Sequence, residues 1–385
     1  MKNISSLKGC YKCGICVNVC PKEIIKFELD KNGFFTPVIH NENNCIECGL
    51  CLKVCAFNNA IGNNNTESYF AGWSLNEHTR SICSSGGIAF ELAKFGIENG
   101  YTVIGVRYNP KDKIAEHFEA NTIEDLLPTT GSKYIQSYAP NGLKNIFKGN
   151  KYMIFGLPCQ IHTLRNIITH RKKESNFILI DFFCHGVPSY LMWKKYLNEK
   201  CCTTGKIKHI DWRNKKKGGW HNSWNMVLVG EKGVASCSIS ENDLFYRFFL
   251  KNRCLNAACY DSCRYKMNNS AADIRLGDLW GQKFSYEEKG VSGIVSFTEK
   301  GLMIIKRLKG NVSIANETGA TVLESQMRDC AKRPASYKII RKLLQTPLSL
   351  KSINNVANII ELIIDKIPMA IKYYPNRALE KMLDR

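Results

Sequence analysis

Eight cysteines in the first 55 residues carry the strongest chemical signal in this sequence. They form two runs, over 10–20 and 45–55, and each run reads C-x2-C-x2-C-x3-C. Three thiolates spaced in this way can converge on one small cluster, and thiolates are the ligands that iron–sulfur clusters take. In bacterial two-cluster ferredoxins the fourth cysteine of each run reaches the cluster of the other run. The spacing therefore predicts two [4Fe–4S] clusters.

This crossed pattern assigns four cysteines to each cluster. One set is Cys10, Cys13, Cys16 and Cys55, and the other is Cys45, Cys48, Cys51 and Cys20. Gly14 and Gly49 fall inside the turns, where glycine adopts a positive φ at little cost. The alternatives are zinc or a redox thiol pair, but zinc sites usually present two C-x2-C pairs. Pro21 follows the first run, whereas Ala56 follows the second and departs from the pattern.

Further cysteines later in the chain suggest a third metal site. Cys254, Cys259 and Cys263 fall within ten residues, and three such ligands need a fourth from elsewhere. Cys184 is the first choice for that ligand and Cys159 is the second. Zinc at the same place, or ordinary cysteines of a cysteine-rich chain, are the alternatives. The remaining cysteines show no ligand spacing and are expected to be structural: Cys83, Cys201, Cys202, Cys237 and Cys330.

Three short glycine-bearing segments are candidates for holding a second cofactor. Residues 84–87 (SSGG) precede a predicted helix and could present backbone N–H groups to a phosphate. Residues 131–134 (GSKY) offer a cation and an aromatic ring, and residues 156–160 (GLPCQ) place Cys159 near a helix start. A helix cap would explain the first segment, and a small buried cysteine would explain the third. The Rossmann and P-loop fingerprints are absent.

The chain has 385 residues, of which 54 are basic and 34 acidic, and its formal net charge is +20. Such a surface suits nucleic acid, an acidic ferredoxin, a flavin nucleotide or a phosphorylated substrate. The basic stretch 213–217, flanked by Trp212 and Trp220, would suit nucleic acid. No helix-turn-helix, zinc-finger or RNP signature accompanies it, so we expect no nucleic-acid partner.

The N-terminus has no apolar leader, and no apolar run approaches the roughly 20 residues of a membrane span. Because cluster-forming thiolates need a reducing compartment, we expect a cytoplasmic protein. The amphipathic segment Asn355–Ile367 ends at Pro368. We expect its apolar stripe to dock on the protein body, with a membrane surface or a partner protein as the alternative. The stripe consists of Val356, Ile359, Ile360, Ile363 and Ile367.

The hydrophobic pattern predicts a hairpin over Ile24–His40, with its turn at Lys31–Gly33, and a linker over Asn58–Ser68. After the linker we expect an α/β region and then an α+β region. Strands are predicted at Tyr69–Leu75, Tyr101–Tyr108, Tyr152–Phe155, Phe177–Phe183, Lys206–Arg213, Trp224–Val229 and Val291–Phe297, and helices at Gly87–Asn99, near Ile161–Ile168 and at Asn242–Leu250. The predicted domains are 1–62, 68–190, 191–335 and a helical extension over 336–385.

The motifs together resemble the coenzyme F420 hydrogenase/dehydrogenase beta-subunit family. After the cysteine runs they are SSGG at 84–87, GSKYIQS at 131–137, FGLPCQ at 155–160, DFFCHGVPS at 181–189, RNKKKGGW at 213–220, CLNAACYDSC at 254–263 and ADIRLGDLWG at 272–281. Each motif is short, but their joint order is specific. The resemblance extends to about residue 300, and no family motif lies beyond about residue 335.

The resemblance implies a two-cluster ferredoxin fold joined to a mixed α/β flavoprotein body without a Rossmann motif. Relatives bind FAD and [4Fe–4S] clusters. They oxidise or reduce coenzyme F420, or reduce chlorophyll intermediates with ferredoxin, and many bacterial members resemble parts of polysaccharide-synthesis systems. The implied FAD contacts are Ser84, Ser85, Gly86, Gly87, Lys133, Tyr134, Pro158, Cys159 and Gln160. The 254–263 loop would hold an extra cluster near the flavin, although Cys259 and Cys263 are separated by three residues where the family commonly has two.

We therefore expect an iron–sulfur flavoprotein oxidoreductase that takes electrons from a ferredoxin-like donor and reduces an anionic organic substrate. One alternative is an electron-transfer subunit that serves a partner oxidoreductase and has no small substrate of its own. Another is an accessory protein of a polysaccharide pathway whose flavin site has become a binding pocket. His185, His162 and Asp181 are the candidate proton donors, and each is equally compatible with a structural role.

Overall fold

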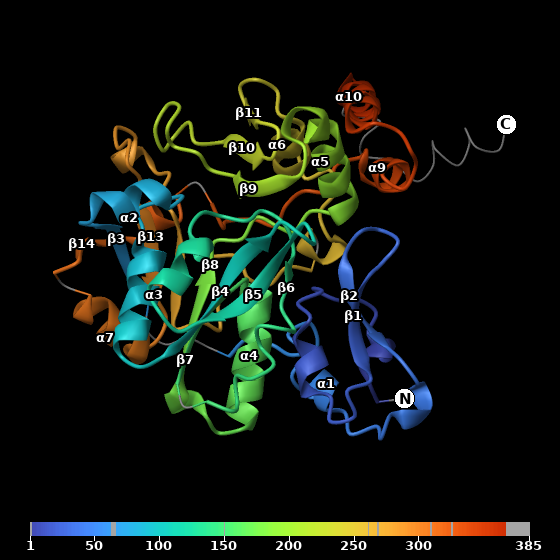
Figure 1. The fold of residues 1–385 in the computed structure, drawn as a ribbon. Helices are drawn as coiled ribbons and strands as arrows, with labels where there is room; N and C mark the ends of the chain where they lie inside the picture. The colour runs from blue at the N-terminus through green and yellow to red at the C-terminus, as the bar shows by residue number, and fades with distance from the viewer. Residues whose placement is uncertain are drawn as a thin grey trace.

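The computed structural model describes residues 2–62, 67–149, 151–260, 262–267, 269–308, 310–324 and 326–366. A small N-terminal module lies against one side of a larger body (Figure 1). The module contains strands β1 Ile25–Leu29 and β2 Phe35–Ile39, helix α1 Leu50–Lys53, and the 3-10 helices η1 Ile4–Ser6, η2 Ile15–Val19 and η3 Glu42–Asn44. The linker predicted over 58–68 lies partly outside the described residues, which omit 63–66.

The predicted hairpin of the module is confirmed. β1 and β2 pair antiparallel, with Ile25 opposite Ile39 and Leu29 opposite Phe35. Gly33 turns the chain with a φ of +78°. A Cβ atom there would lie 2.5 Å from the Ser189 hydroxyl, so the turn also fits closely against the body. The predicted positive φ is confirmed at both cysteine-run glycines, Gly14 (+81°) and Gly49 (+67°).

The body is built around one mixed sheet of nine strands, in the order β14-β3-β13-β12-β8-β7-β4-β5-β6. Its strands are β3 Ser68–Ser74, β4 Thr102–Asn109, β5 Ile114–Ala120, β6 Ser137–Tyr138, β7 Tyr152–Gly156, β8 Phe177–Phe182, β12 Ile274–Asp278, β13 Ser292–Ser296 and β14 Val312–Glu317. The central strands β12, β8, β7 and β4 run parallel, and the β3, β13 and β14 edge is antiparallel.

Successive side chains of the central strands point to opposite faces of the sheet and pack into two separate hydrophobic cores. Ile154 and Leu179 face α4 and the N-terminal module, whereas Met153 and Ile178 face α3 and α7. This alternation explains why the predicted strand at Phe177–Phe183 is an unbroken apolar run, because both of its faces are covered. The body helices are α2 Glu77–Ile82, α3 Ile88–Glu98, α4 Pro158–His170, α5 Tyr190–Thr204, α6 Leu244–Leu250, α7 Glu299–Arg307, α8 Gly319–Val322, α9 Tyr337–Leu343 and α10 Leu350–Lys366, with 3-10 turns η4 Glu124–Thr129, η5 Glu174–Asn176, η6 Ala257–Cys259 and η7 Gln282–Phe284.

A second, antiparallel sheet covers one end of the body (Figure 1). It consists of β9 Ile207–Asp211, β10 Asn225–Gly230 and β11 Val234–Ser238. An aromatic core joins this sheet to α5 and α6, and Trp193, Trp212 and Phe245 are almost completely buried in it. The strands and helices predicted for this region are therefore confirmed, although β11 and α5 were not anticipated.

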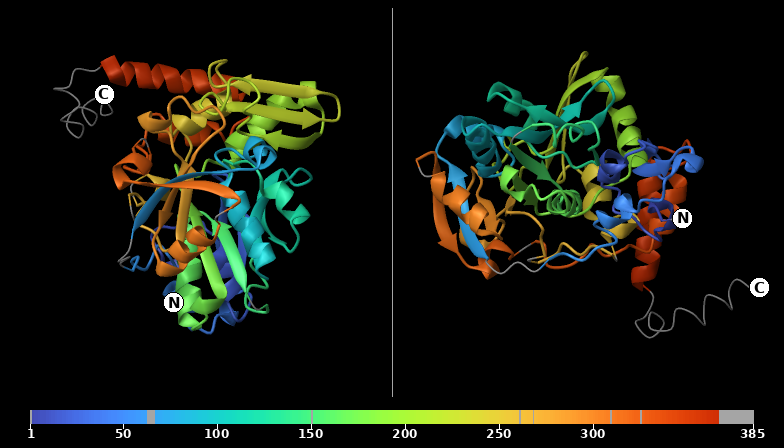
Figure 2. Two further views of the ribbon diagram at one scale, coloured as in Figure 1. Left: turned by 90° about the vertical axis from the view of Figure 1, so that its left-hand side faces the viewer. Right: turned by 90° about the horizontal axis from the view of Figure 1, so that it is seen from below.

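Helix α10 lies along the outer edge of this end (Figure 2, left). It begins five residues before the predicted segment, and Ile367 and Pro368, where the segment was predicted to end, lie outside the described residues. The prediction that its apolar stripe docks on the body is wrong for Ile359 and Ile363, which are 58% and 56% exposed, whereas Val356 and Ile360 are half-buried. The helix docks mainly through other residues.

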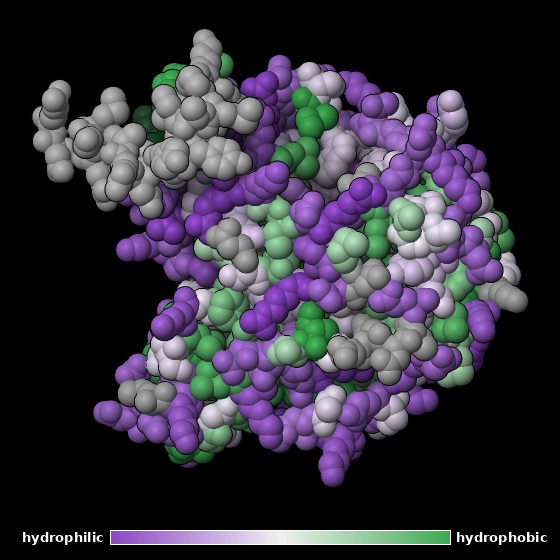
Figure 3. Space-filling view, turned by 180° about the vertical axis from the view of Figure 1, so that it is seen from behind, coloured by the Kyte–Doolittle hydropathy of each residue, from purple (hydrophilic) through white to green (hydrophobic). Residues whose placement is uncertain are grey.

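Most of the surface seen from behind is hydrophilic (Figure 3). No helix within the described residues is long and apolar enough to cross a membrane.

Candidate iron–sulfur and cofactor sites

Two sets of cysteines line two separate cavities in the N-terminal module. A cavity of about 180 Å³ is lined by Cys10, Cys13, Cys16 and Cys55. A smaller one, of about 20 Å³, is lined by Cys20, Cys45, Cys48 and Cys51. These are the two sets that the crossed ferredoxin pattern groups together, so the chain brings one distant cysteine to each local group of three.

The first cavity has the chemistry of a thiolate-binding cluster site. Burial, and next the neighbouring Cys13, raise the pKa of the Cys10 thiol to about 12. Burial also raises the pKa of Cys16 well above its usual value, and Cys13, Cys10 and Cys55 raise it further. Four thiolates held this close need positive charge between them, which cluster iron would supply. The Lys12 N–H already donates to Cys10 Sγ at 3.1 Å.

The two cavities differ in their exposure. Cys16 is buried beside the body, whereas Cys48 is exposed and neighbouring Ile46 is 57% exposed. Within the described part of the chain, no group of three or more His, Cys, Asp or Glu side chains is arranged to hold a metal ion. The ligands of a cubane bind different iron atoms and stand around the cluster, so they need not converge on one point.

Helix α4 connects the first cavity to the body. Thr163 lines that cavity, and its hydroxyl lies 3.5 Å from Cys13 Sγ. The same hydroxyl oxygen accepts a hydrogen bond from Ala56 N at 3.3 Å and donates to the Cys159 carbonyl at 3.1 Å. A proline at position 56 has no N–H and could not make this bond. The departure from the ferredoxin pattern at Ala56 thus has a local structural reason.

Four cysteines of the body lie close to one another, beyond the start of α4. Burial raises the pKa of Cys159 well above its usual value, and nearby Cys13, Cys184, Cys259 and Cys263 raise it further. Burial, and then Cys184, raise the pKa of Cys259 to about 12. The group comes from three segments of the chain: the start of α4, the end of β8 and the loop around η6.

Cys254, predicted as a member of this group, lies apart from it. It is buried in the aromatic core with α5 and α6, and burial raises the pKa of its thiol to about 12 without a contribution from any other described cysteine. Its carbonyl accepts a hydrogen bond from Ser189 N at 2.9 Å. Cys159, the second choice for a ligand, is thus brought close to the three remaining cysteines, and Cys254 is not.

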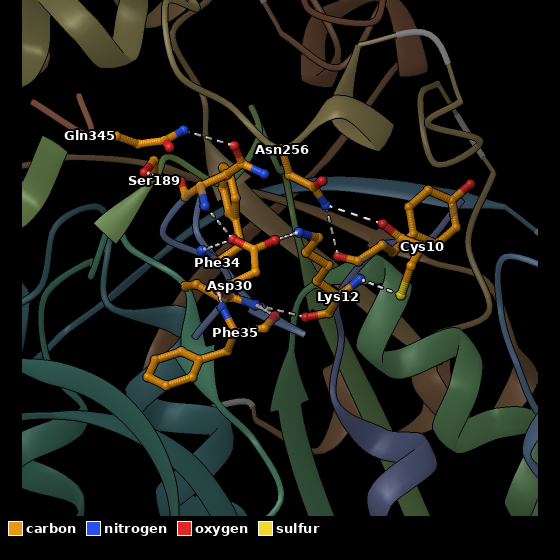
Figure 4. Close-up of polar contacts among 11 residues, drawn as sticks. Cys10, Lys12, Asp30, Phe34, Phe35, Ser189, Asn256 and Gln345 are labelled. Atoms are coloured by element: carbon orange, nitrogen blue, oxygen red, sulfur yellow. Dashed lines mark hydrogen bonds and ion pairs between the residues drawn. The ribbon is translucent and has the colours of Figure 1, made fainter. Parts of the chain in front are cut away.

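Three of the sequence motifs hold the N-terminal module on the body (Figure 4). The Gln136 side chain donates to the Phe35 carbonyl and accepts from Phe35 N, both at 2.8 Å. Ser189 donates to the Asn32 carbonyl at 2.6 Å, and Asn256 donates to the Tyr11 carbonyl at 3.2 Å. These motifs therefore position the cysteine cavities relative to the body.

The SSGG and GSKY segments meet at one hydrogen bond, in which Ser132 N donates to the Ser84 hydroxyl at 2.7 Å. Gly86 packs on the sheet, where a Cβ would lie 2.6 Å from the Gly72 carbonyl oxygen. Close packing therefore explains this glycine without a cofactor. Gly87 has a φ of +88° and lies directly before α3, and the Ser85 hydroxyl donates to the Val291 carbonyl at 2.8 Å.

Two half-buried lysines lie beside this junction. The ammonium group of Lys133 donates to three carbonyl groups, and burial lowers its pKa to about 7. Lys215 donates to the carbonyls of Arg80, Ser85 and Lys289, and burial lowers its pKa to about 8. Both lysines are close enough to Cys83 to interact with it electrostatically. The junction is therefore rich in positive charge.

Arg213 lies beside these lysines in a cage of aromatic rings. Its guanidinium group stacks 4.5 Å from the Trp224 ring and 4.8 Å from the Trp280 ring. It donates to the Tyr134 hydroxyl at 3.1 Å and to Asp278 at 3.0 Å. Its Nη2 atom is buried and has no hydrogen-bond partner among the described residues. Although Asp278 balances the charge of this guanidinium group, its unsatisfied Nη2 would favour a ligand that accepts a hydrogen bond.

The family follows from comparison with known proteins. Residues 149–319 match the model for the C-terminal part of the beta subunit of coenzyme F420 hydrogenase/dehydrogenase. Residues 9–59 match the 4Fe–4S dicluster domain. The chain therefore carries the C-terminal domain of the F420 hydrogenase/dehydrogenase beta-subunit family together with a 4Fe–4S dicluster domain. It is an iron–sulfur protein of an oxidoreductase family, and the resemblance seen in the sequence motifs is confirmed.

The chain is also similar to a solved structure. That structure is described as the xenon-derivatised F420-reducing [NiFe] hydrogenase complex from Methanosarcina barkeri. The two chains share 19% identity with a TM-score of 0.46, over 72% of this chain and 87% of the other. No curated protein matches the sequence.

The third segment proposed from the family resemblance, 156–160, lies at the start of α4. Pro158 is the first residue of this helix. The side-chain oxygen of Gln160 accepts from Leu157 N at 2.8 Å, and its amide nitrogen donates to the Ser137 hydroxyl at 3.1 Å. The segment therefore contacts the last residue of the GSKYIQS motif, Ser137, and not its Lys133. This contact lies next to the body cysteines.

The three candidate proton donors have different surroundings. Asp181 is completely buried and forms a two-bonded ion pair with Arg275, at 2.7 and 2.8 Å. His162 donates to or accepts from the Tyr265 hydroxyl at 3.0 Å, and burial lowers its pKa to about 4. Burial likewise lowers the pKa of His185. The pairing of Asp181 with Arg275 is a structural role.

The sequence alone did not reveal that part of the basic stretch 213–217 is directed into the protein. Arg213, Trp212 and Trp220 are each at most 2% exposed, whereas Lys216 and Lys217 are exposed. The alternation of basic residues with tryptophan is the available signal, although on its own it suits a nucleic-acid surface, a partner that we do not expect. Two of its basic residues instead belong to the buried junction described above.

Proposed function

We propose that this protein is an iron–sulfur flavoprotein oxidoreductase. It accepts single electrons at the N-terminal module and delivers them to an anionic organic substrate held by the body. The observation that supports the proposal is a series of neighbouring groups between the first cysteine cavity and the Arg213 cage, which are Thr163, the body cysteines and a row of aromatic rings. The two ends of this series have complementary chemistry, with thiolate ligands at one end and buried cations with aromatic rings at the other.

Within this proposal, each cavity of the module holds one [4Fe–4S] cluster. Cys10, Cys13, Cys16 and Cys55 bind the inner cluster, and Cys20, Cys45, Cys48 and Cys51 bind the outer one. A third cluster is bound by the body group, which revises the predicted ligands. Cys159 takes the place of Cys254, beside Cys184, Cys259 and Cys263, because the electrostatic contacts described above link these four thiols.

The outer cavity is the proposed site of electron entry. Exposed Cys48 makes it the more accessible of the two cavities, and exposed Lys2 and Lys22 line it. Lys53, on α1, is also exposed. Positive charge around an accessible redox site favours an acidic donor of the ferredoxin type. The inner cavity, by contrast, contacts α4 through Thr163.

The body continues this series through aromatic contacts. His185 follows Cys184 in the chain, and its ring lies 5.0 Å from that of Phe249. The Phe249 ring lies 5.2 Å from Tyr134, and Tyr134 stacks on Trp224 at 5.5 Å. These rings lead directly from the body cysteines to the Arg213 cage.

The residues of the cage fit a flavin nucleotide. Arg213 Nη2 would gain a partner from an anionic group, and Lys133 and Lys215 would supply further positive charge. Tyr134 and Trp224 stack on each other, so a planar ring system would pack against the outside of this aromatic group and not between its rings. FAD, when bound, converts between one-electron and two-electron transfer. Because the Rossmann fingerprint is absent from the sequence, the proposed site uses a helix start and lysine side chains in place of that motif.

The direct test is iron and flavin analysis of the anaerobically reconstituted full chain, with EPR of the reduced protein. Three clusters would give about twelve irons, and two would give about eight. We expect about twelve irons and one flavin. A protein that bound iron but no flavin would contradict the proposed function. Coenzyme F420 is the first substrate to test, and sugar nucleotides of polysaccharide synthesis follow.

A second function is favoured by the description of the matched family as a beta subunit. In that case the chain transfers electrons to or from a partner oxidoreductase and turns over no small substrate alone. The cofactors of the isolated protein would then still be reduced by a ferredoxin-like donor. A stable oxidoreductase that copurifies with the native protein would support this alternative.

A further inference from the structure

Helix α10 presents an apolar face to solvent. Ile359, Leu362 and Ile363 are 58%, 57% and 56% exposed. At 3.6 residues per turn these three positions lie on one side of the helix. The opposite side carries Ile353 and Ala357, which are completely buried against the body. The helix is therefore apolar on both its docked face and its free face.

A buried arginine fixes this orientation. Arg253, whose side chain is completely buried, donates to the side-chain oxygens of Asn354 and Asn358, each at 2.7 Å. Its Nε atom donates to the Glu361 carboxylate at 2.8 Å. These three acceptors lie on the docked side of α10, between the buried apolar residues. Rotation of the helix to cover its outward isoleucines would break all of these charge-assisted bonds.

The surroundings of this face are strongly basic. Residues 331–364 contain one acidic residue, Glu361, which is paired with Arg253. They contain six basic residues: Lys332, Arg333, Lys338, Arg341, Lys342 and Lys351. Those on α9 and α10 are exposed. The last two residues of α10 add one charge of each sign, Asp365 and Lys366. Ile339 on α9 and Leu348 before α10 add further apolar surface, at 44% and 43% exposed.

We propose that α9 and α10 form a docking surface for an anionic lipid membrane. Apolar side chains in a row on one helix face, surrounded by lysine and arginine, are what an interfacial helix requires. The helix lies along an outer edge of the molecule (Figure 2), and apolar surface is visible at this end from behind (Figure 3, upper left). A second copy of the chain would instead bring one basic surface against another, at a formal net charge of +20 each. The surface is separate from the cofactor sites and does not depend on the proposed function.

Cosedimentation of the full chain with lipid vesicles tests this proposal. The wild-type protein should bind phosphatidylcholine vesicles that contain about one-third phosphatidylglycerol, and should bind pure phosphatidylcholine much more weakly. The double variant I359Q/I363Q should bind the anionic vesicles about tenfold more weakly, because burial of its outward face is lost. The matched control is Met303→Gln on α7, a residue with the same 58% exposure that should leave binding unchanged.

A second variant tests the electrostatic part. K338Q/R341Q/K342Q should weaken binding to anionic vesicles and reduce its dependence on salt. Unchanged melting temperatures and cluster absorbance would show that both variants fold. The proposal is overturned if the wild-type protein does not bind anionic vesicles, or if I359Q/I363Q binds them as the wild type does. It is also overturned if these isoleucines are needed only for dimerisation or for binding an acidic protein, as measured by light scattering and copurification.

Discussion

The N-terminal module and the body both gather cysteines, but they do so in opposite ways. In the module, three of each four cysteines come from one short run, and turns at Gly14 and Gly49 bring them together. In the body, four cysteines come from three distant segments, and only the completed fold makes them neighbours. Local spacing is therefore a reliable guide to the first kind of site and a poor guide to the second.

The largest expected effect is on the module. The module is a small domain, and we expect it to depend on its clusters for stability, as small metal-binding domains generally do. Cys16→Ser should therefore abolish both module clusters, with a loss of about eight irons. Cys254→Ser, in a cysteine that is equally buried but lies in the aromatic core, should leave the iron content unchanged. Iron analysis of the two purified variants tests both expectations. A loss of iron from Cys254→Ser would show that Cys254 is a cluster ligand, as predicted from the sequence.

The next effect concerns the body group. Cys159→Ser should remove about four irons and leave the EPR signals of the two module clusters in place. The body does not need this cluster to fold, because its sheet has a large apolar core on both faces. Cys201→Ser is the matched control, since Cys201 is exposed and no other cysteine is predicted to act with it. A wild-type iron content in Cys159→Ser would contradict a third cluster.

The contrast between the regions extends to pH. Burial lowers the pKa of Lys133 to about 7, so its ammonium form is lost as the pH rises through this value. Retention of an anionic flavin should therefore weaken between pH 6 and pH 9, by about tenfold for the loss of one buried charge contact. Lys133→Met should bind flavin weakly at both ends of this range. Equilibrium dialysis measures the affinity, and a pH-independent affinity in the wild type would exclude this role for Lys133.

The smallest effect is expected where the two regions meet. Ala56→Pro would restore the ferredoxin pattern but remove the N–H that bonds to Thr163. We expect it to lower the free energy of unfolding by about 1 kcal/mol, which is a few degrees in melting temperature, with no loss of iron. Ala56→Gly keeps the N–H and is the control. A proline variant more stable than the wild type would show that the Thr163 contact does not explain this departure.

The same comparison explains what could be predicted from the sequence. The hairpin and its Gly33 turn depend on residues close in sequence, and the fold has them as expected. Three cysteines of each module cavity also come from one short run, and the fourth comes from the other run. The separation of Cys254 from Cys259 could not be foreseen, because the loop between them packs closely against Gly186, about seventy residues earlier in the chain. Neither could the outward face of α10, which depends on Arg253, about one hundred residues earlier in the chain.

The central claim is that electrons reach the flavin from the module through the body cysteines. Rapid mixing of the reconstituted full chain with a reduced ferredoxin, followed at the flavin absorbance, tests it most directly. The account predicts rapid flavin reduction in the wild type and in Cys201→Ser. In Cys159→Ser, the flavin should remain bound and oxidised over the same period. Equally fast reduction in Cys159→Ser would contradict the account.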